Sequence, residues 1–209
     1  MAHRDTVRRL LEKAGRTYAE EAGIKLTDKP APLYRLLVLS TLLSTRIKAG
    51  LAVDAARELW KAGLGNPRAM AKSDWQARVD ALGRAHYKRY DEQTSTALGA
   101  AAELLLDKYS GDLRKLKSEA DGEPAAIRKR LAEFPRLGPV GADIFSREAQ
   151  LVWPELRPHL DKKALQGAGK LGLPTDPKRL ARLVSEEEQA VFAAALVRVA
   201  LEPRLAEEG

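Results

Sequence analysis

Cysteine is absent from the 209 residues of this chain. Its absence excludes disulfides, thiolate nucleophiles, cysteine-ligated zinc and cysteine-ligated iron–sulfur clusters. The chain has three histidines, His3, His86 and His159, which lie far apart and lack the i, i+4 spacing of a helical metal site. We therefore expect neither a bound metal ion nor another cofactor.

Long apolar runs are also missing, and no stretch reaches the 18 or so consecutive apolar residues of a membrane span. Residues 1–11 lack the apolar segment that a secretory signal needs. Hydrophobic residues make up 44% and charged residues 31% of the chain, which is typical of a globular protein. We expect no membrane partner and a cytoplasmic location, at the nucleoid if the protein is bacterial.

Basic residues outnumber acidic ones, 36 to 29, so the net charge is +7. A positive surface field attracts polyanions. Basic clusters occur at residues 84–89, 128–130 and 162–163. Any one cluster is compatible with a solvated helix face, whereas the three together favour a polyanionic partner.

The hydrophobic pattern follows a helical period, and strand-like alternation is missing. The sequence therefore predicts an all-α fold. Amphipathic helices are predicted at residues 4–22 and 88–109, and residues 33–45 are so apolar that this helix must be buried on nearly all sides. Because no flexible linker is present, two lobes within one chain are expected in preference to independent domains.

Residues 123–153 predict two helices joined by a tight turn. The first helix ends near Phe134, and Pro139 occupies a first helical position, where its missing N–H group costs nothing. The N–H groups and the positive dipole end at the start of the second helix favour a phosphate. Pro154 and Pro158 then interrupt the helical pattern, and Asp161 follows them.

In this order the buried helix, the hairpin and the aspartate resemble the helix-hairpin-helix DNA glycosylases of the endonuclease III superfamily. The resemblance covers about residues 30–175. Leu42-Leu43-Ser44-Thr45-Arg46 is similar to the family's Leu-Leu-Ser-x-Gln segment, and residues 83–88 are similar to its basic loop. Phe134-Pro135-Arg136-Leu137-Gly138 resembles the hairpin Leu-Pro-Gly-Val-Gly, and Leu160-Asp161 resembles the Val-Asp of the catalytic acid. Each match is short, and their order carries the resemblance.

The resemblance implies a two-lobed, endonuclease III-like fold. A six-helix lobe would span residues 28–152 and contain the hairpin at about 123–153, and residues 1–27 with 153–209 would form the second lobe. The resemblance also implies that the protein, expected to be a monomer, flips a damaged or mismatched base out of double-stranded DNA and excises it. Asp161 is the implied catalytic residue. The implied DNA-binding residues are Arg46, Arg84, Lys88, Arg136, Leu137, Gly138, Val140 and Gly141.

Two departures from the family change the expected chemistry. Val140 occupies the position of the lysine that bifunctional members use as a Schiff-base nucleophile, and a valine cannot form an imine. The implied reaction is therefore monofunctional, with water attack assisted by Asp161, although Lys162 and Lys163 remain alternative amines. Because the family's cluster-binding cysteines are missing, packing alone must hold the second lobe.

Three site residues have a second interpretation. Arg136 replaces the hairpin's first glycine, which disfavours a positive φ and predicts a slightly altered turn with a guanidinium that can reach a phosphate. Arg46 replaces a glutamine that fills the gap left by the flipped base, or it is simply a helix-end cation. Asp161 precedes a helical segment and is a good N-cap, alone or together with a catalytic role.

Two functions of different classes therefore remain open. The first is a monofunctional DNA N-glycosylase that uses Asp161. The second is a non-catalytic helix-hairpin-helix protein that binds damaged, bent or branched DNA, in which Asp161 is structural. The sequence does not select the base that would be recognised.

Overall fold

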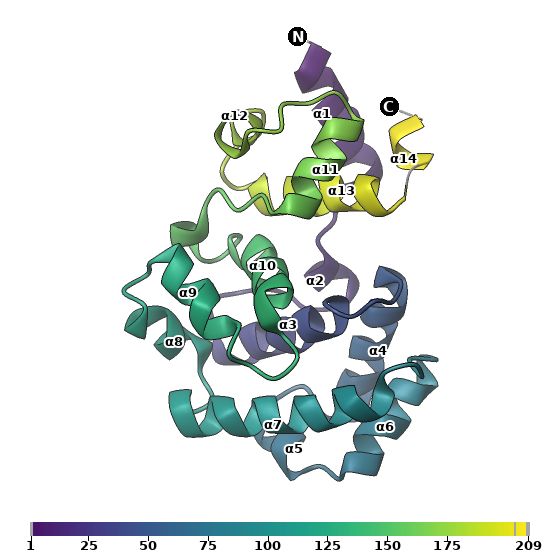
Figure 1. The fold of residues 1–209 in the computed structure, drawn as a ribbon, viewed down its shortest axis with the longest axis vertical. Coiled ribbons are helices and arrows are strands. Elements are labelled where there is room, and N and C mark those ends of the chain that lie inside the picture. Colours follow the sequence, from purple (N-terminus) through teal and green to yellow (C-terminus); the bar gives the residue numbers. More distant parts are fainter. Residues whose placement is uncertain (1, 203, 208–209) are drawn as a thin grey trace. The chain divides into compact units, whose positions relative to one another are not determined.

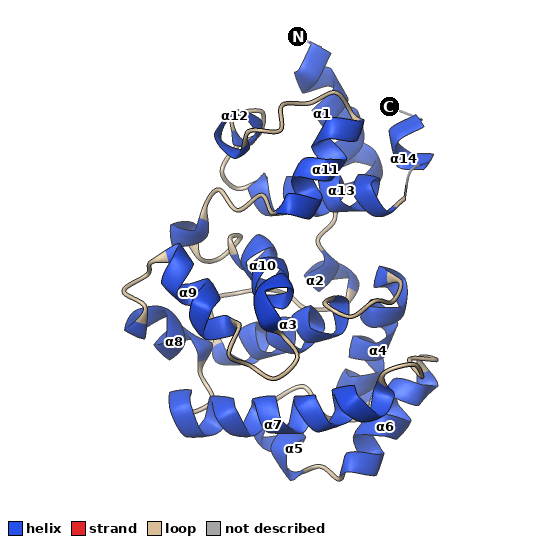
Figure 2. Cartoon of the chain, in the orientation of Figure 1, coloured by secondary structure: helices blue, strands red, loops and turns tan. Residues whose placement is uncertain are grey.

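The computed structural model describes residues 2–202 and 204–207 (Figure 1). Over these residues the chain is helical and contains no strand, so the predicted all-α fold is confirmed (Figure 2). The chain divides into two compact units: unit 1 comprises Met1–Tyr18 and Ser146–Gly209, and unit 2 comprises Ala19–Phe145. Both divisions lie earlier in the chain than the predicted lobe boundaries at 27/28 and 152/153, and the second falls within a helix, Gly138–Ala149.

Helix α3 (Pro30–Leu43) forms the centre of unit 2. Pro30 is the first residue of α3, a position where a backbone N–H donor is not needed. The apolar side chains of α3 are buried on nearly all sides, as the composition of this segment predicts. Helices α4 and α8 pack against α3, while α5 and α6 pack against α7. The remaining bounds in this part of the chain are α2 (Tyr18–Glu21), α4 (Ala49–Lys61), α5 (Pro67–Lys72), α6 (Trp75–Arg84), α7 (Asp91–Tyr109), α8 (Leu113–Glu119), α9 (Pro124–Leu131) and α10 (Gly138–Ala149).

A buried arginine joins three helices of unit 2. Arg78, on α6, is 8% exposed. Its Nε donates to the Ser95 carbonyl oxygen on α7 at 2.9 Å, and its Nη1 donates to the Ser73 carbonyl oxygen, just after α5, at 2.7 Å. The guanidinium also fills the space over Gly99, where a Cβ would lie 2.9 Å from Nη2. One side chain therefore satisfies backbone acceptors from two neighbouring segments.

Unit 1 is built from helices at both ends of the chain. The helix predicted at residues 4–22 is interrupted, because α1 (Ala2–Ala14) ends where the chain turns tightly at Gly15. A Cβ at Gly15 would lie 2.1 Å from the Leu11 carbonyl oxygen, so only glycine fits this turn. The other elements are the 3₁₀ turn η1 (Pro154–Leu156), α11 (Lys162–Lys170), α12 (Pro177–Ala181), α13 (Gln189–Leu201) and α14 (Arg204–Glu207).

Close packing of α11 on α13 holds unit 1 together. At Gly167, a Cβ would lie 1.8 Å from the carbonyl oxygen of Leu196 on α13. The two backbones therefore approach to a distance that only glycine permits. The apolar side of α13 includes Phe192 and Leu196, both fully buried. Apolar packing of this kind holds α11 and α13 together.

Gly167→Ala is expected to lower the free energy of unfolding by about 3 kcal/mol, because the added methyl group meets backbone that cannot move aside. Gly169→Ala is the matched control on the same helix, since its Cβ would meet only Thr175 Cγ2 at an ordinary 3.6 Å. The control should be neutral or stabilising by about 0.5–1 kcal/mol through helix propensity. Urea unfolding followed by circular dichroism measures both, and equal losses would contradict the packing described.

Candidate nucleic-acid interface

The predicted hairpin is present in unit 2, where α9 ends at Leu131 and α10 begins at Gly138. Arg136 and Gly138 both adopt left-handed backbone conformations, with φ of +60° and +58°. Arg136 therefore takes a positive φ, which the sequence disfavours for a residue other than glycine. A side chain in this conformation costs about 1–2 kcal/mol, and contacts elsewhere in unit 2 must offset that cost.

Three contacts hold Arg136 in place. Its Nη1 donates to Gln93 Oε1 at 2.6 Å, and its guanidinium carbon lies 5.7 Å from the centre of the Tyr90 ring. The Ser44 hydroxyl lies 3.1 Å from the Arg136 carbonyl oxygen. The hairpin turn is therefore tied to the end of α3 and to the start of α7.

Backbone donors are available at the start of α10. The N–H of Leu137 donates to Phe134 O and that of Gly141 donates to Leu137 O, at 3.1 and 2.9 Å. Within the described residues, the N–H groups of Gly138 and Val140 donate to no backbone carbonyl oxygen. Val140 is 63% exposed, so an anion has access to this helix start.

The other two predicted hairpin residues face the interior. Leu137 is 2% exposed, and Gly141 is buried against it, since a Cβ at Gly141 would lie 2.6 Å from Leu137 Cδ1. The side chain of Leu137 cannot reach DNA without unfolding the turn, which leaves its backbone for any contact. Together these residues determine the shape of the turn that presents Gly138 and Val140.

A hydroxyl chain fixes the loop that carries Arg46. The Thr45 hydroxyl donates to Leu42 O and lies 3.1 Å from the Tyr87 hydroxyl, which in turn lies 3.2 Å from Thr94 Oγ1. Because Thr45 uses its hydrogen on Leu42, Tyr87 donates to Thr45 and accepts from Thr94. Tyr87 is 1% exposed, so it packs inside unit 2, and Arg46 remains exposed on the loop that Tyr87 holds.

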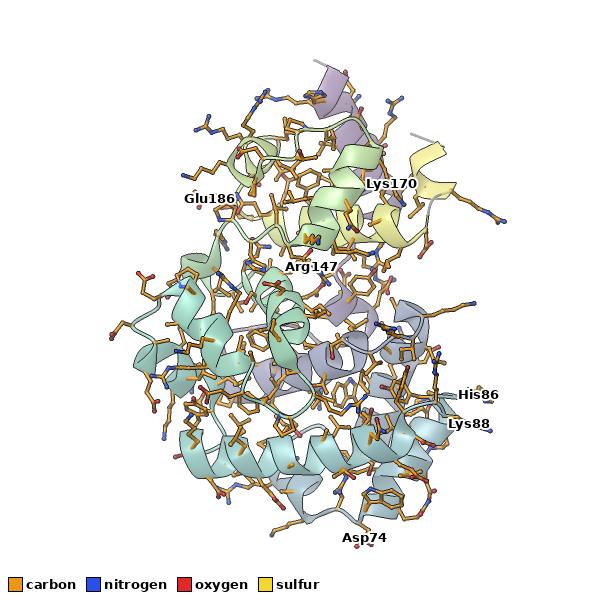
Figure 3. The ribbon with its side chains drawn as sticks, viewed as in Figure 1. Asp74, His86, Lys88, Arg147, Lys170 and Glu186 are labelled. Atoms are coloured by element: carbon orange, nitrogen blue, oxygen red, sulfur yellow. The ribbon has the colours of Figure 1, made fainter. Side chains whose placement is uncertain are left out.

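Arg84 and Lys88 differ in how free their charges are. Arg84 Nε lies 3.2 Å from Glu58 Oε2, and hydrogen bonds from Lys61 and from Arg84 hold the pKa of the Glu58 carboxyl below its usual value. Part of the Arg84 charge is therefore neutralised. Lys88 is exposed beside His86 in the loop between α6 and α7, where Figure 3 shows both side chains projecting outward.

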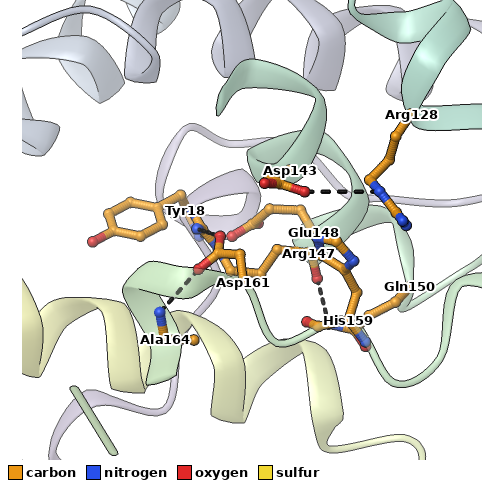
Figure 4. Close-up of polar contacts among 9 residues, drawn as sticks. All are labelled: Tyr18, Arg128, Asp143, Arg147, Glu148, Gln150, His159, Asp161 and Ala164. Atoms are coloured by element: carbon orange, nitrogen blue, oxygen red, sulfur yellow. Dashed lines mark hydrogen bonds and ion pairs between the residues drawn. The ribbon is translucent and has the colours of Figure 1, made fainter. Parts of the chain in front are cut away.

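Asp161 is the N-cap of α11 in unit 1, as its sequence context predicts. Its Oδ1 accepts the N–H of Ala164 at 2.9 Å, and its Oδ2 lies 2.5 Å from Arg147 Nη1 (Figure 4). The side chains of Arg147 and Asp161 are 3% and 6% exposed. Both carboxylate oxygens are therefore engaged, and the sequence analysis missed Arg147. Burial is decided by packing, so no signal in the sequence marks Arg147 as the partner of Asp161.

A buried polar cluster surrounds this pair. The Tyr18 ring lies 4.2 Å from the Arg198 guanidinium carbon and 5.9 Å from that of Arg147, and the Tyr18 N–H donates to Glu148 Oε1 at 3.1 Å. Glu148 is fully buried.

The side-chain amide of Gln150 also holds the segment before Asp161, since the His159 N–H donates to Gln150 Oε1 and Gln150 Nε2 donates to His159 O, both at 2.9 Å. Lys162 and Lys163 are exposed at the start of α11.

The described residues lack two further kinds of feature. No group of three or more histidine, cysteine, aspartate or glutamate side chains is placed to hold a metal ion in this part of the chain. No helix within the same residues is long and apolar enough to cross a membrane.

Comparison with known proteins identifies the fold. No protein-family model and no curated protein matches the sequence. Among solved structures, the chain is similar to a trapped endonuclease III–DNA covalent intermediate, an estranged-adenine complex. The match has a TM-score of 0.57 and 12% sequence identity, and it covers 94% of this chain and 82% of the other. At this identity the likeness shows the fold alone, and the chain has the all-α, helix-hairpin-helix fold of endonuclease III.

Proposed function

We propose that this chain binds duplex DNA through the α9–α10 hairpin and excises a damaged or mismatched base by hydrolysis, without a lysine nucleophile. The observation that carries the proposal is the turn itself. Gly138 and Val140 present N–H groups without backbone partners at an exposed helix start, in the same unit as the exposed cations Arg46, Lys88 and Arg136. The shared fold with a protein that has been trapped covalently on DNA supports it.

The hairpin suits the DNA backbone better than the bases. Phosphate oxygens would accept hydrogen bonds from the N–H groups of Gly138 and Val140, and the positive end of the α10 dipole favours their charge. The guanidinium of Arg136 uses Nη1 on Gln93 and retains further donors for a second phosphate oxygen. Contacts of this kind are independent of sequence and weaken as salt rises.

The chemical step assigns two roles to Asp161. As the bond between C1′ and the base breaks, the base leaves with the electron pair and C1′ becomes an oxocarbenium-like cation. An ionised carboxylate stabilises that cation and accepts a proton from the water that adds to C1′. Val140 supplies no amine, and the proposed reaction uses neither Lys162 nor Lys163 as a nucleophile, so no imine forms and the DNA strand stays intact.

Base release from a panel of duplexes tests the proposal. The duplexes carry uracil, a thymine–guanine mismatch, oxidised pyrimidines or alkylated purines, and each reaction is analysed with and without subsequent alkaline cleavage. We expect strand breaks only after alkali and no covalent trapping by borohydride. Strand breaks without alkali, together with trapping, would show a lysine-dependent reaction and exclude the monofunctional one.

A second function is favoured by a specific observation, the engagement of both oxygens of Asp161 by Arg147 and Ala164. A buried, paired N-cap is what a non-catalytic binder of damaged, bent or branched DNA would retain. If no duplex of the panel loses a base while distorted DNA still binds, and Asp161→Asn leaves that binding unchanged, the binder is correct.

Arg136→Gly is expected to weaken duplex binding and to lower the slope of log affinity against log salt by about 1, because one phosphate contact is lost. Glycine adopts a φ of +60° without steric strain, so the free energy of unfolding should change by no more than about 1 kcal/mol. Fluorescence anisotropy over a salt series measures the slope. Lys72→Ala is the control, since it removes one exposed charge at the end of α5 and should change the slope less. Equal slopes for the two variants would exclude Arg136 from the interface.

A further inference from the structure

The ion pair between Arg147 and Asp161 is buried, but it leaves one donor of the guanidinium without a hydrogen bond. A single contact joins them, from Nη1 to Oδ2 at 2.5 Å. The Nε of Arg147 is buried and has no hydrogen-bond acceptor among the residues that the structure describes. Arginine–carboxylate pairs are frequently bidentate, and their two parallel hydrogen bonds satisfy more of the arginine's donors than a single contact does. The geometry of this pair is therefore not the one that maximises stability.

The charges around Asp161 are mostly positive. Arg147 on α10 neutralises its carboxylate, and the exposed Lys162 follows it at the start of α11. Arg198 on α13 lies over the Tyr18 ring, which Arg147 also approaches. The second anion in this cluster is Glu148, one residue after Arg147, which accepts the Tyr18 N–H. A cation that approaches Asp161 thus meets a pair without net charge, with further cations beside it.

We propose that Arg147 is a positioning residue that controls how much negative charge Asp161 presents. In the structure the guanidinium holds Oδ2 and cancels the carboxylate's field. Asp161 stabilises a cationic sugar fully only when the contact between Arg147 and Oδ2 is broken, while the Ala164 N–H keeps Oδ1 in place. This inference rests on the proposed function, because it assigns the carboxylate to the sugar of bound DNA.

Two duplexes that differ at one position test the inference without any catalysis. One carries a neutral tetrahydrofuran abasic analogue, and the other carries a pyrrolidine abasic analogue whose ring nitrogen is protonated and positively charged. The ratio of their dissociation constants, neutral over cationic, reports the negative charge available to the sugar position. Because both duplexes share every phosphate contact, the ratio is insensitive to the general affinity for DNA.

For the wild-type protein we expect a ratio near one. Arg147→Gln should raise the ratio about tenfold, because the carboxylate then faces the cation without its counter-charge. Arg147→Lys, which keeps the charge, should stay near the wild-type ratio. The double variant Arg147→Gln with Asp161→Asn should return to a ratio near one, which shows that the gain requires the carboxylate.

Two results would overturn the inference. The first is a wild-type ratio of about ten or more, since Asp161 would then be available despite the pair. The second is an unchanged ratio in a folded Arg147→Gln variant, since Asp161 would then be structural. If thermal melting shows that Arg147→Gln does not fold, Arg147→Met is measured in its place, with the same expected rise in the ratio and the same contradicting result. The proposed function is judged separately, by base release from the lesion panel.

Discussion

Asp161→Asn is expected to lower the rate of base release by about 10²–10⁴-fold while duplex affinity stays near that of the wild type. Asparagine retains an oxygen for the Ala164 N–H, so the start of α11 keeps its cap. The variant has no negative charge to stabilise the sugar cation or to take a proton from water. Single-turnover kinetics on whichever duplex of the panel loses its base provides the measurement.

Stability must be controlled in this experiment, because the substitution leaves the buried guanidinium of Arg147 without its counter-charge. Breaking such a pair from one side costs about 3–5 kcal/mol, so the rates must be compared below the unfolding temperature of the variant. Asp143→Asn is the matched control on α10, since its carboxylate is 43% exposed and lies 3.9 Å from Arg128 Nε. Base release that survives in Asp161→Asn and falls in Asp143→Asn would transfer the catalytic role to Asp143.

Arg78→Met is expected to lower the free energy of unfolding of unit 2 by about 3–5 kcal/mol. Methionine fills part of the volume but leaves the buried carbonyl oxygen of Ser95 and the half-buried one of Ser73 without their donor. Burial lowers the pKa of the Arg78 guanidinium, which reflects the cost that those hydrogen bonds offset. Over the whole chain, such a loss corresponds to a fall of about 10 °C in melting temperature.

Urea unfolding and thermal melting of the full chain measure this loss. Arg114→Met is a suitable control, because Arg114 is exposed and its ion pair with Asp112 lies at the surface. Surface pairs contribute little, so the control should melt close to the wild type. If Arg78→Met also melts close to the wild type, the three segments are held by apolar packing, and the hydrogen bonds of Arg78 are dispensable.

Local signals predicted most of the helical architecture. The apolar run of α3, the tight turn between α9 and α10 and the cap of α11 each depend on neighbouring residues, and all three are present. The break after α1 was missed. Gly15 continues an amphipathic pattern in sequence, and only the approach of its backbone to Leu11 shows that the helix ends there.

The site was harder to predict than the fold. Sequence placed Arg136, Leu137 and Val140 together on a turn and assigned all three to DNA, but burial separates them, with Leu137 inside and Val140 exposed. Arg84 was likewise assigned to DNA from the sequence, but its guanidinium pairs with Glu58, 26 residues earlier in the chain. Sequence neighbours share a turn, whereas their exposure depends on which distant helix packs over them.

By itself, the sequence determined the helical class, the position of the hairpin and the cap at Asp161. These are properties of composition and of contacts within a few residues. Tertiary structure decided that the Asp161 carboxylate is paired with a buried arginine. Arg147 lies 14 residues away along the chain and approaches Asp161 only when the chain folds back after α10. An ion pair depends on the distance between its charges, and that distance is set by packing rather than by order along the chain.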